Sequence, residues 1–310
     1  MTQLPLVYSP SYQATISASH RFPMGKYGAV RNEVAERPWF HRAALHRASP
    51  ATADQACLAH DADYVERLLT GRLSDAEVKA IGLPQNRSVA ARAFASAGGT
   101  LLACRLAIEA GLAASLAGGS HHANRQGGRG FCVMNDVGVA LSVLLDEQLK
   151  TGQGLERALV VDLDVHQGDG TAEIFADEAR VFTASLHCED NYPFTKAHSD
   201  LDMGLPRGMG DSGYLPALDD LLHRLDAQAV ASDLIVYNAG VDPHQDDRLG
   251  RLTLTDAGLA ERDRMVFEWA RVHRKPLCLV LGGGYDRDID VIAERHAQVF
   301  DRLYAAYQHR

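Results

Sequence analysis

The chain has 310 residues, 46% of them hydrophobic and 23% charged, and its 31 basic and 40 acidic side chains give a formal net charge of −9. This acidic balance disfavours non-specific binding to nucleic acid, which depends on neutralising phosphates. No apolar run approaches the roughly 18–20 residues of a membrane span, and no secretion signal is expected at the N-terminus. Five dispersed cysteines without a Cys-x-x-Cys pair favour reduced thiols. We therefore expect a cytoplasmic protein that binds neither nucleic acid nor membrane.

Short apolar runs alternate with longer helical patterns along the chain. Strands are expected at 4–8, 158–161, 181–186, 234–237 and 276–281, with a weaker one at 15–17. Helices are expected at 88–117, with an interruption at Gly98-Gly99, and at 136–149, 171–177, 213–230, 255–273 and 287–307. Asp136 is the expected N-cap of the second of these helices. The alternation predicts an α/β fold with a mainly parallel sheet between two helical layers, and the absence of a linker predicts one domain over 1–310.

Polar, glycine-containing loops follow three of the expected strands, at 162–169, 238–242 and 282–285. Chemistry in parallel sheets gathers at the carboxyl ends of the strands. We therefore expect these three loops to meet at one edge of the sheet.

The first loop carries a candidate metal site. Asp162, Asp164 and His166 would share one side of an extended chain. Buried carboxylates commonly need a divalent cation as compensation, although a polar turn after a strand is the plain alternative. Asp242 either begins a turn or supplies a third ligand. Two carboxylates and one imidazole, from Asp164, His166 and Asp242, suit zinc or ferrous iron with coordination positions left open.

The adjacent residues His121 and His122 are candidates for proton transfer. Two carboxylate ligands cancel the charge of the metal and leave a weaker electrophile, so help with protons would be useful. A chance surface feature or a structural pair is the alternative. Asp162 and Asp169 could each orient one imidazole. Tyr285 follows three glycines and could hydrogen-bond an oxyanion, unless that segment is an ordinary glycine-rich strand exit.

In chain order, these pieces resemble the histone deacetylase superfamily, which includes acetylpolyamine amidohydrolases and acetoin-utilisation proteins. The matching segments are 121–123, 130–132 with Asn135-Asp136, 162–171, 185–187, 238–242 and 282–285. The resemblance covers nearly the whole chain from His20 onward. Residues 247–250 and 262–267 look closest to the class IV branch and its bacterial relatives.

The resemblance implies an arginase/deacetylase-like fold with a central eight-stranded parallel sheet. It implies zinc at Asp164, His166 and Asp242, with ferrous iron as the alternative in the cell. The family also binds a structural K⁺ or Na⁺ through main-chain carbonyls. Here that site would comprise the carbonyls of Asp162, Asp164, His166 and Leu186 and the hydroxyl of Ser185, with a second one near Phe175 and Val181.

Catalytic roles follow from the same resemblance. His122, paired with Asp169, would be the general base and then the general acid. His121, paired with Asp162, would supply electrostatic stabilisation. Tyr285 would polarise the scissile carbonyl and bind the oxyanion. Seven other histidines, His60 among them, are expected to have no partners and no role.

The substrate tunnel implied by the resemblance is lined by Gly130 and Phe131, with Tyr192 as the opposite wall and Gly283 also in contact with substrate. The branches specific for polyamines have a glutamate at the position of Leu249, so a leucine favours acyl-lysine over acetylpolyamine. The loop 189–198 departs from the family pattern and leaves the acyl length open.

We therefore expect a zinc-dependent amidohydrolase that removes acetyl or longer acyl groups from lysine side chains of proteins or peptides. The alternatives are an acetylpolyamine amidohydrolase or another small-molecule deacetylase, a ureohydrolase with a second metal, and a non-catalytic protein that binds acyl-lysine. The sequence does not indicate the oligomeric state.

Overall fold

The computed structural model describes residues 3–309, so residues 1, 2 and 310 at the ends of the predicted domain lie outside it. Across this range the strands form one eight-stranded parallel sheet in the order β2-β1-β3-β8-β7-β4-β5-β6. The strands are β1 (Leu4–Tyr8), β2 (Ala43–Arg47), β3 (Leu112–Ser115), β4 (Ala158–Asp162), β5 (Val181–Cys188), β6 (Leu201–Leu205), β7 (Leu234–Asn238) and β8 (Leu277–Val280). This confirms the predicted fold class, an α/β protein with a central eight-stranded parallel sheet.

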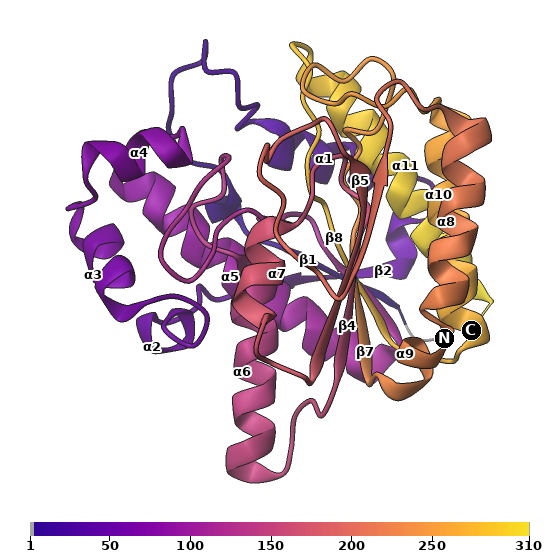
Figure 1. The fold of residues 1–310 in the computed structure, drawn as a ribbon, viewed down its shortest axis with the longest axis horizontal. Coiled ribbons are helices and arrows are strands. Elements are labelled where there is room, and N and C mark those ends of the chain that lie inside the picture. Colours follow the sequence, from indigo (N-terminus) through magenta and orange to yellow (C-terminus); the bar gives the residue numbers. More distant parts are fainter. Residues whose placement is uncertain (1–2, 310) are drawn as a thin grey trace.

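Helices cover both faces of the sheet, which Figure 1 views nearly edge on. One layer consists of α1 (Lys26–Ala35), α8 (Asp211–Arg224), α10 (Asp256–Val272) and α11 (Ile289–Gln308). The other layer consists of α5 (Arg87–Ala110), α6 (Asp136–Thr151) and α7 (Asp169–Phe175). Outside α5 lie the short helices α2 (Ala53–Ala56), α3 (Ala62–Thr70) and α4 (Asp75–Ile81), whereas α9 (Asp226–Ala231) follows α8 directly.

The central strands are buried on both faces. All residues of β4, β7 and β8 are buried, because a parallel sheet between two helical layers has no face toward water. This is why these strands read as continuous apolar runs in the sequence. The edge strands β2 and β6 are partly exposed and have mixed patterns, and neither was predicted.

The predicted interruption of a helix at Gly98-Gly99 is wrong. Helix α5 passes through both glycines, which are required because the chain packs closely against the helix there: a Cβ at Gly98 would lie 2.0 Å from the Ser49 carbonyl oxygen, and one at Gly99 1.8 Å from the Tyr12 hydroxyl. The helix ends at Ala110, since Gly111 adopts a positive φ of 83°. The predicted helix at 88–117 therefore wrongly included strand β3.

Three further predicted features also need correction. The weak strand at 15–17 is irregular chain, and the helix expected at 213–230 is two helices, α8 and α9. The N-cap of α6 is Asn135, whose side chain accepts a hydrogen bond from the Gly138 amide. Asp136 instead accepts hydrogen bonds from the Ser120 amide and the Thr100 hydroxyl, so it fixes the loop that carries the two histidines.

Helix α5 is, within residues 3–309, the one helix long and apolar enough to cross a membrane by length and composition. In the fold, 67% of the most apolar 18-residue window of this helix is buried.

Candidate active site

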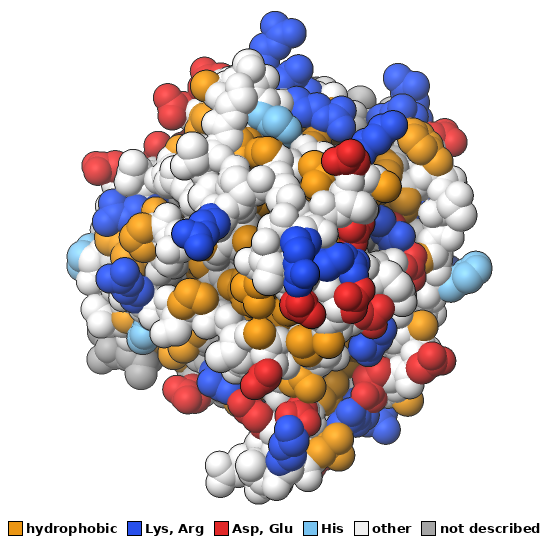
Figure 2. All heavy atoms as spheres, turned by 90° about the vertical axis from the view of Figure 1, so that its left-hand side faces the viewer, with side chains coloured by type: hydrophobic (Ala, Val, Ile, Leu, Met, Phe, Trp, Pro, Cys, Tyr) orange, Lys and Arg blue, Asp and Glu red, His pale blue; other side chains and the backbone are white. Residues whose placement is uncertain are grey.

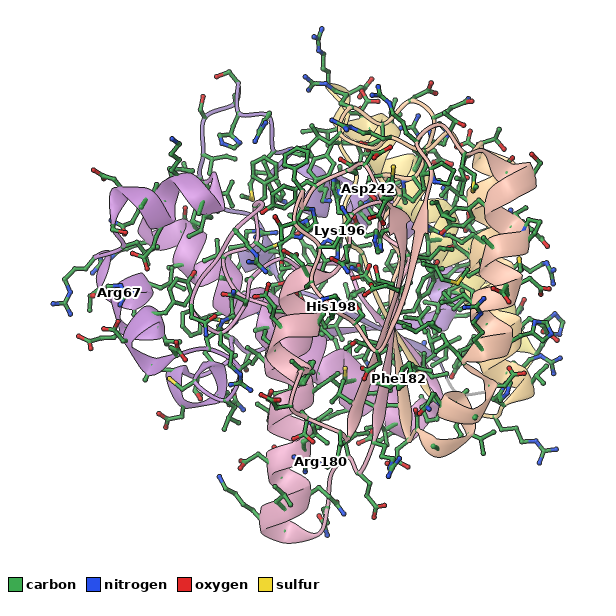
Figure 3. All side chains as sticks on the ribbon, viewed as in Figure 1. Arg67, Arg180, Phe182, Lys196, His198 and Asp242 are labelled. Atoms are coloured by element: carbon green, nitrogen blue, oxygen red, sulfur yellow. The ribbon has the colours of Figure 1, made fainter. Side chains whose placement is uncertain are left out.

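The candidate site lies at the carboxyl ends of the three neighbouring strands β8, β7 and β4. Their register pairs Asn238 with both Asp162 and Val280, so the three strands end in line. Figure 3 places Asp242 near the upper end of the sheet and Arg180 toward the opposite end. The three polar loops therefore converge, as the parallel arrangement predicts.

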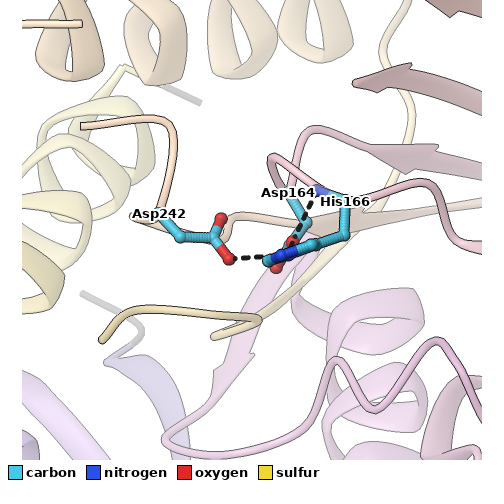
Figure 4. A group of neighbouring side chains, drawn as sticks. All are labelled: Asp164, His166 and Asp242. Atoms are coloured by element: carbon cyan, nitrogen blue, oxygen red, sulfur yellow. Dashed lines mark hydrogen bonds and ion pairs between the residues drawn. The ribbon is translucent and has the colours of Figure 1, made fainter. Parts of the chain in front are cut away.

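Asp164, His166 and Asp242 form a buried cluster whose ligand atoms all lie within 4.8 Å of one another. The His166 Nδ1 atom lies 2.9 Å from the Asp164 Oδ1 atom and 3.2 Å from the Asp242 Oδ2 atom (Figure 4). Within residues 3–309, Asp242 Oδ2 is buried without a well-directed hydrogen bond. Two carboxylates, one with an unsatisfied oxygen, and an imidazole form a ligand set that fits a divalent cation such as zinc or iron.

Backbone groups orient the two carboxylates of this cluster. The Gly283 amide donates to Asp164 Oδ2 at 2.7 Å, and the Val165 amide donates to Asp242 Oδ1 at 2.9 Å. A Cβ at Gly283 would lie 2.0 Å from Asp242 Oδ2, so only glycine fits at this position. Gly283 was predicted to contact substrate. In the structure its amide supports a candidate metal ligand.

Each of the two adjacent histidines is paired with one carboxylate. The His121 Nδ1 atom lies 2.7 Å from Asp162 Oδ2, and the His122 Nδ1 atom lies 2.6 Å from Asp169 Oδ1. Both imidazoles are 4% exposed, and their ring centres are 4.2 Å apart. Because Nδ1 of each ring faces a carboxylate, the Nε2 atoms are left for the centre of the site.

The two imidazoles differ in charge. Burial would lower the pKa of His121, but the carboxylates of Asp162 and Asp164 outweigh it and raise that pKa to about 9. Burial and the neighbouring His121 lower the pKa of His122 to about 4, despite the carboxylate of Asp169. Near neutral pH the pair therefore consists of one cation and one neutral imidazole that can accept a proton.

Several supporting residues were not predicted. Arg129 Nη2 lies 2.9 Å from Asp169 Oδ2, and its Nε atom donates to the His122 carbonyl at 2.8 Å. Asn238 Nδ2 donates to Asp162 Oδ1 at 3.1 Å. Both residues sit in matching segments or next to one, but nothing in the sequence indicated which carboxylate each would contact.

Tyr285 is also held by a residue that the sequence did not single out. Its amide donates to Asp247 Oδ2 at 2.7 Å, while the other oxygen of this carboxylate accepts from the amides of Leu249 and Gly250, both at 2.8 Å. Asp247 therefore ties the segment that carries the tyrosine to the loop that follows Asp242.

Four of the five residues predicted to contact substrate line one pocket of about 540 Å³, together with His122, His166 and Tyr285. These four are Gly130, Phe131, Tyr192 and Leu249. Phe131 lies with its ring centre 6.1 Å from that of Tyr285, and Tyr192 packs edge-on against His122 at 4.8 Å. The pocket therefore leads between aromatic rings to the candidate metal ligands.

The loop 189–198, whose shape the sequence left open, is anchored at several points. Gln167 exchanges two hydrogen bonds with the backbone of Ala197, at 2.8 and 3.0 Å. Lys196, labelled in Figure 3, donates to the carbonyls of Asn191 and Pro193. The loop presents Phe194 at the mouth of the pocket, where its side chain is 80% exposed.

His60 has two partners, contrary to the prediction. Its Nδ1 atom lies 2.6 Å from the Asn124 carbonyl oxygen, and its Nε2 atom accepts from the Asn135 amide at 3.0 Å. Burial lowers its pKa to about 4. This neutral imidazole connects the segment after His122 to the start of helix α6.

The candidate K⁺ or Na⁺ site stays a prediction. The residues assigned to it are neighbours, since Asp162 pairs with Ser185 across β4 and β5. The Ser185 hydroxyl lies 3.0 Å from His187 Nδ1. The second site, near Phe175 and Val181, is likewise untested.

Comparisons with known proteins agree with this fold. The sequence model described as "Histone deacetylase domain" matches residues 20–303. An uncharacterized protein of the cyanobacterium Picosynechococcus is 42% identical over 94% of this chain and 96% of its own length. "Histone deacetylase 2" of Arabidopsis thaliana is 28% identical over 92% of this chain and 75% of its own length. A "Probable deacetylase" of Methanothermobacter thermautotrophicus is 28% identical over 91% of this chain and 85% of its own length.

The sheet and the site define an α/β protein with a buried cluster of side chains that could hold a metal ion. The chain belongs to the histone deacetylase family. Family membership supports amidohydrolase activity on acetylated substrates, and the cluster of Asp164, His166 and Asp242 fits the metal dependence that is general in this family.

Proposed function

We propose that the protein is a zinc-dependent amidohydrolase that removes acetyl or longer acyl groups from lysine side chains of proteins or peptides. The single observation that carries this proposal is the placement of two His–Asp pairs beside a three-ligand cluster at the end of an aromatic pocket. Asp164, His166 and Asp242 would hold Zn²⁺, with Fe²⁺ as the alternative in the cell. Such a cation, when bound, supplies a Lewis acid for the amide carbonyl and for the attacking water.

The two histidines would divide the proton chemistry. His122 is neutral and lines the pocket, and its Nδ1 atom is held by Asp169, so its Nε2 atom can take a proton from the water and pass it to the leaving amine. The carboxylates of Asp162 and Asp164 raise the pKa of His121, so this residue would carry the positive charge that stabilises negative charge as it develops. The pairing of unequal imidazoles therefore supports one acid–base residue and one electrostatic residue.

Tyr285 would donate its hydroxyl hydrogen to the oxygen of the scissile carbonyl. Burial and the carboxylates of Asp242 and Asp164 raise the pKa of this phenol well above its usual value, so it keeps its hydrogen near neutral pH. A fixed donor beside a developing oxyanion is the kind of preorganised group that accelerates acyl transfer.

Acyl-lysine is favoured over acetylpolyamine by the walls of the pocket. Phe131 and Tyr192 suit the apolar stem of a lysine, and Leu249 offers no charge to a distal ammonium group. No Asp or Glu occurs among the described residues that line this pocket, whereas five Lys or Arg residues do. A polycationic substrate would therefore meet repulsion at the mouth.

A ureohydrolase and a non-catalytic binder have less support. A ureohydrolase would require a second metal cluster, and within residues 3–309 the cluster of Asp164, His166 and Asp242 is the one group of three or more such side chains. A non-catalytic binder would not need both His–Asp pairs and a partly buried tyrosine beside them. A structural K⁺ or Na⁺ and a cytoplasmic location are parts of the proposal that rest on the resemblance and the cysteine pattern.

The decisive experiment is a screen of the purified, Zn²⁺-loaded protein against lysine peptides that carry acetyl to long-chain acyl groups, with acetylspermidine included. We expect release of free lysine side chains from at least one peptide and its loss after chelation. Turnover of acetylspermidine alone would favour the polyamine alternative. Tight binding of acyl-lysine without turnover, in protein loaded with Zn²⁺ or Fe²⁺, would favour the non-catalytic binder.

A further inference from the structure

The mouth of the pocket is basic, although the protein as a whole carries a formal charge of −9. Its lining includes five cationic residues, which we call the basic rim: Arg21, Lys79, Arg207, Arg248 and Arg251. They come from four separate segments, namely the chain before α1, helix α4, the turn after β6 and the loop that follows Asp242. A concentration of one sign of charge at an opening attracts ligands of the opposite sign.

These cations lack carboxylate partners. Within residues 3–309, none of the basic rim residues lies in an ion pair, whereas other surface arginines such as Arg67 and Arg180 do. Arg21 lies over the ring of Phe131 at 4.9 Å, and Arg251 donates to the Asp190 carbonyl oxygen. Lys79, Arg207 and Arg248 are at least partly exposed. Like charges without compensation repel one another. An anion bound between the rim residues would therefore lower their electrostatic energy.

The basic surface continues beyond the mouth. A second pocket of about 580 Å³ shares Arg21 and Arg248 with the first and adds Arg287. Its one carboxylate among the described lining residues, Asp286, lies 3.7 Å from the guanidinium of Arg295. Figure 2 shows Lys and Arg side chains gathered along the upper edge of the molecule, the end at which Figure 3 labels Asp242. A chain that leaves the tunnel on this side would pass between cations.

We propose that the basic rim selects acyl-lysines that are flanked by acidic residues in a peptide or protein. This inference rests on the proposed function, because it assumes that a lysine stem occupies the tunnel. The flanking residues of such a substrate would then lie at the mouth, where several cations from different segments can reach both sides. The exposed ring of Phe194 adds an apolar contact to the same opening. A peptide fits this combination better than a nucleic acid, since aromatic rings beside the pocket suit the apolar stem of a lysine side chain.

The test compares three peptides of equal length that share a central acetyl-lysine and differ in its neighbours, which are Glu, Gln or Lys. At low salt we expect kcat/KM to be at least about fivefold higher for the Glu peptide than for the Gln peptide, and lowest for the Lys peptide, since each exposed ion pair contributes a factor of roughly two to five. The preference should shrink as salt is raised. Equal values for the three peptides overturn the inference and leave the proposed function intact. No turnover of any of them, nor of other acyl peptides, counts against the proposed function itself.

Matched variants locate the preference. Arg207→Gln and Arg248→Gln should each lower the Glu-to-Gln ratio of kcat/KM about two- to fivefold. The control is Arg157→Gln, which removes an exposed arginine just before β4, at the opposite end of the sheet, and should keep the ratio. A ratio that falls equally in the control would show a general charge effect and overturn the assignment to the rim. A second inhibitor experiment compares a short single-stranded oligonucleotide with a non-acetylated Glu peptide of equal charge. Stronger inhibition by the oligonucleotide would overturn the proposal that the rim selects acidic peptides.

Discussion

The floor and the mouth of the pocket are built in opposite ways. The floor consists of the two His–Asp pairs and the three candidate metal ligands, and each of these residues is at most 6% exposed. Its carboxylates accept short hydrogen bonds from backbone amides and imidazoles. The basic rim is largely exposed, comes from four segments and has no carboxylate partners within residues 3–309. The floor is thus fixed for chemistry, whereas the rim is left available for recognition.

This contrast predicts where substitutions will act. A change in the floor removes a charge or a hydrogen bond that nothing else replaces, because water has little access to it. A change in the rim alters one of several screened charges. Floor substitutions should therefore lower kcat or metal content by orders of magnitude, and rim substitutions should change the preference among substrates a few-fold.

The largest effect is expected from Asp242→Ala. Removal of one of three ligands should abolish stoichiometric metal binding and lower activity by well over the roughly 10–100-fold that loss of an outer partner costs. Metal content by mass spectrometry after dialysis against Zn²⁺ checks this. Asp246→Ala, an exposed carboxylate in the same loop, is the control and should keep its metal. Unchanged zinc stoichiometry in Asp242→Ala would remove this residue from the ligand set.

Tyr285→Phe tests the residue proposed to bind the oxyanion beside the floor. Loss of the hydroxyl should lower kcat by about 10²–10³-fold, the range measured for single oxyanion donors, while metal content stays the same. Steady-state kinetics on one acetyl-lysine peptide measures both kcat and KM. Tyr192→Phe is the matched control, because its ring lines the same pocket beside His122 and we assign no role to its hydroxyl. Full activity in Tyr285→Phe would refute the assigned role.

Acid should lower the free energy of unfolding through His60, which supports the segment after His122. The Asn135 amide donates to Nε2, so Nδ1 carries the hydrogen that it donates to Asn124, and the folded protein holds this imidazole neutral. Its pKa falls from 6.5 to about 4 on folding. Between these pH values the unfolded chain binds a proton that the folded chain does not, so the free energy of unfolding decreases as the pH falls, by at most about 1.4 kcal/mol per pH unit for this group.

His60→Gln keeps a donor and an acceptor but does not titrate. Urea unfolding at pH 7, 6 and 5 should show a shallower loss of stability than in the parent protein. His41→Gln removes an exposed histidine and should retain the parent slope. Identical slopes in all three proteins would mean that His60 is not held neutral.

The sequence predicted the floor better than the rim for physical reasons. The central strands β4, β7 and β8 are buried on both faces, so their apolar runs were visible, and parallel strands bring their following loops together. Edge strands β2 and β6 carry mixed patterns because one side meets water. The basic rim has no sequence signature, since its members are spread along the sequence from Arg21 to Arg251 and each alone is an ordinary surface cation.

Residues that act through the floor were equally hard to predict. Arg129 and Asp247 contact Asp169 and the Tyr285 amide only because distant loops fold against each other. Asp136 was misread as a helix cap, since an aspartate at the start of a helix fits that role well. In the structure its carboxylate accepts hydrogen bonds from the Ser120 amide, in the loop that carries the two histidines, and from the Thr100 hydroxyl.

The smallest effect is expected from Phe194→Ala, which tests whether the mouth of the pocket contributes to binding alone or also to the chemistry of the floor. Phe194 is 80% exposed, and its ring centre lies 6.3 Å from that of Tyr192. Loss of its partial contact with a bound peptide should raise KM about two- to fivefold, with kcat unchanged, because little apolar area is involved. Leu149→Ala, another exposed apolar side chain on α6, should change neither constant. If Phe194→Ala lowered kcat instead, loop 189–198 would have to position Tyr192 against His122 during the reaction, and the mouth would then be part of the catalytic floor.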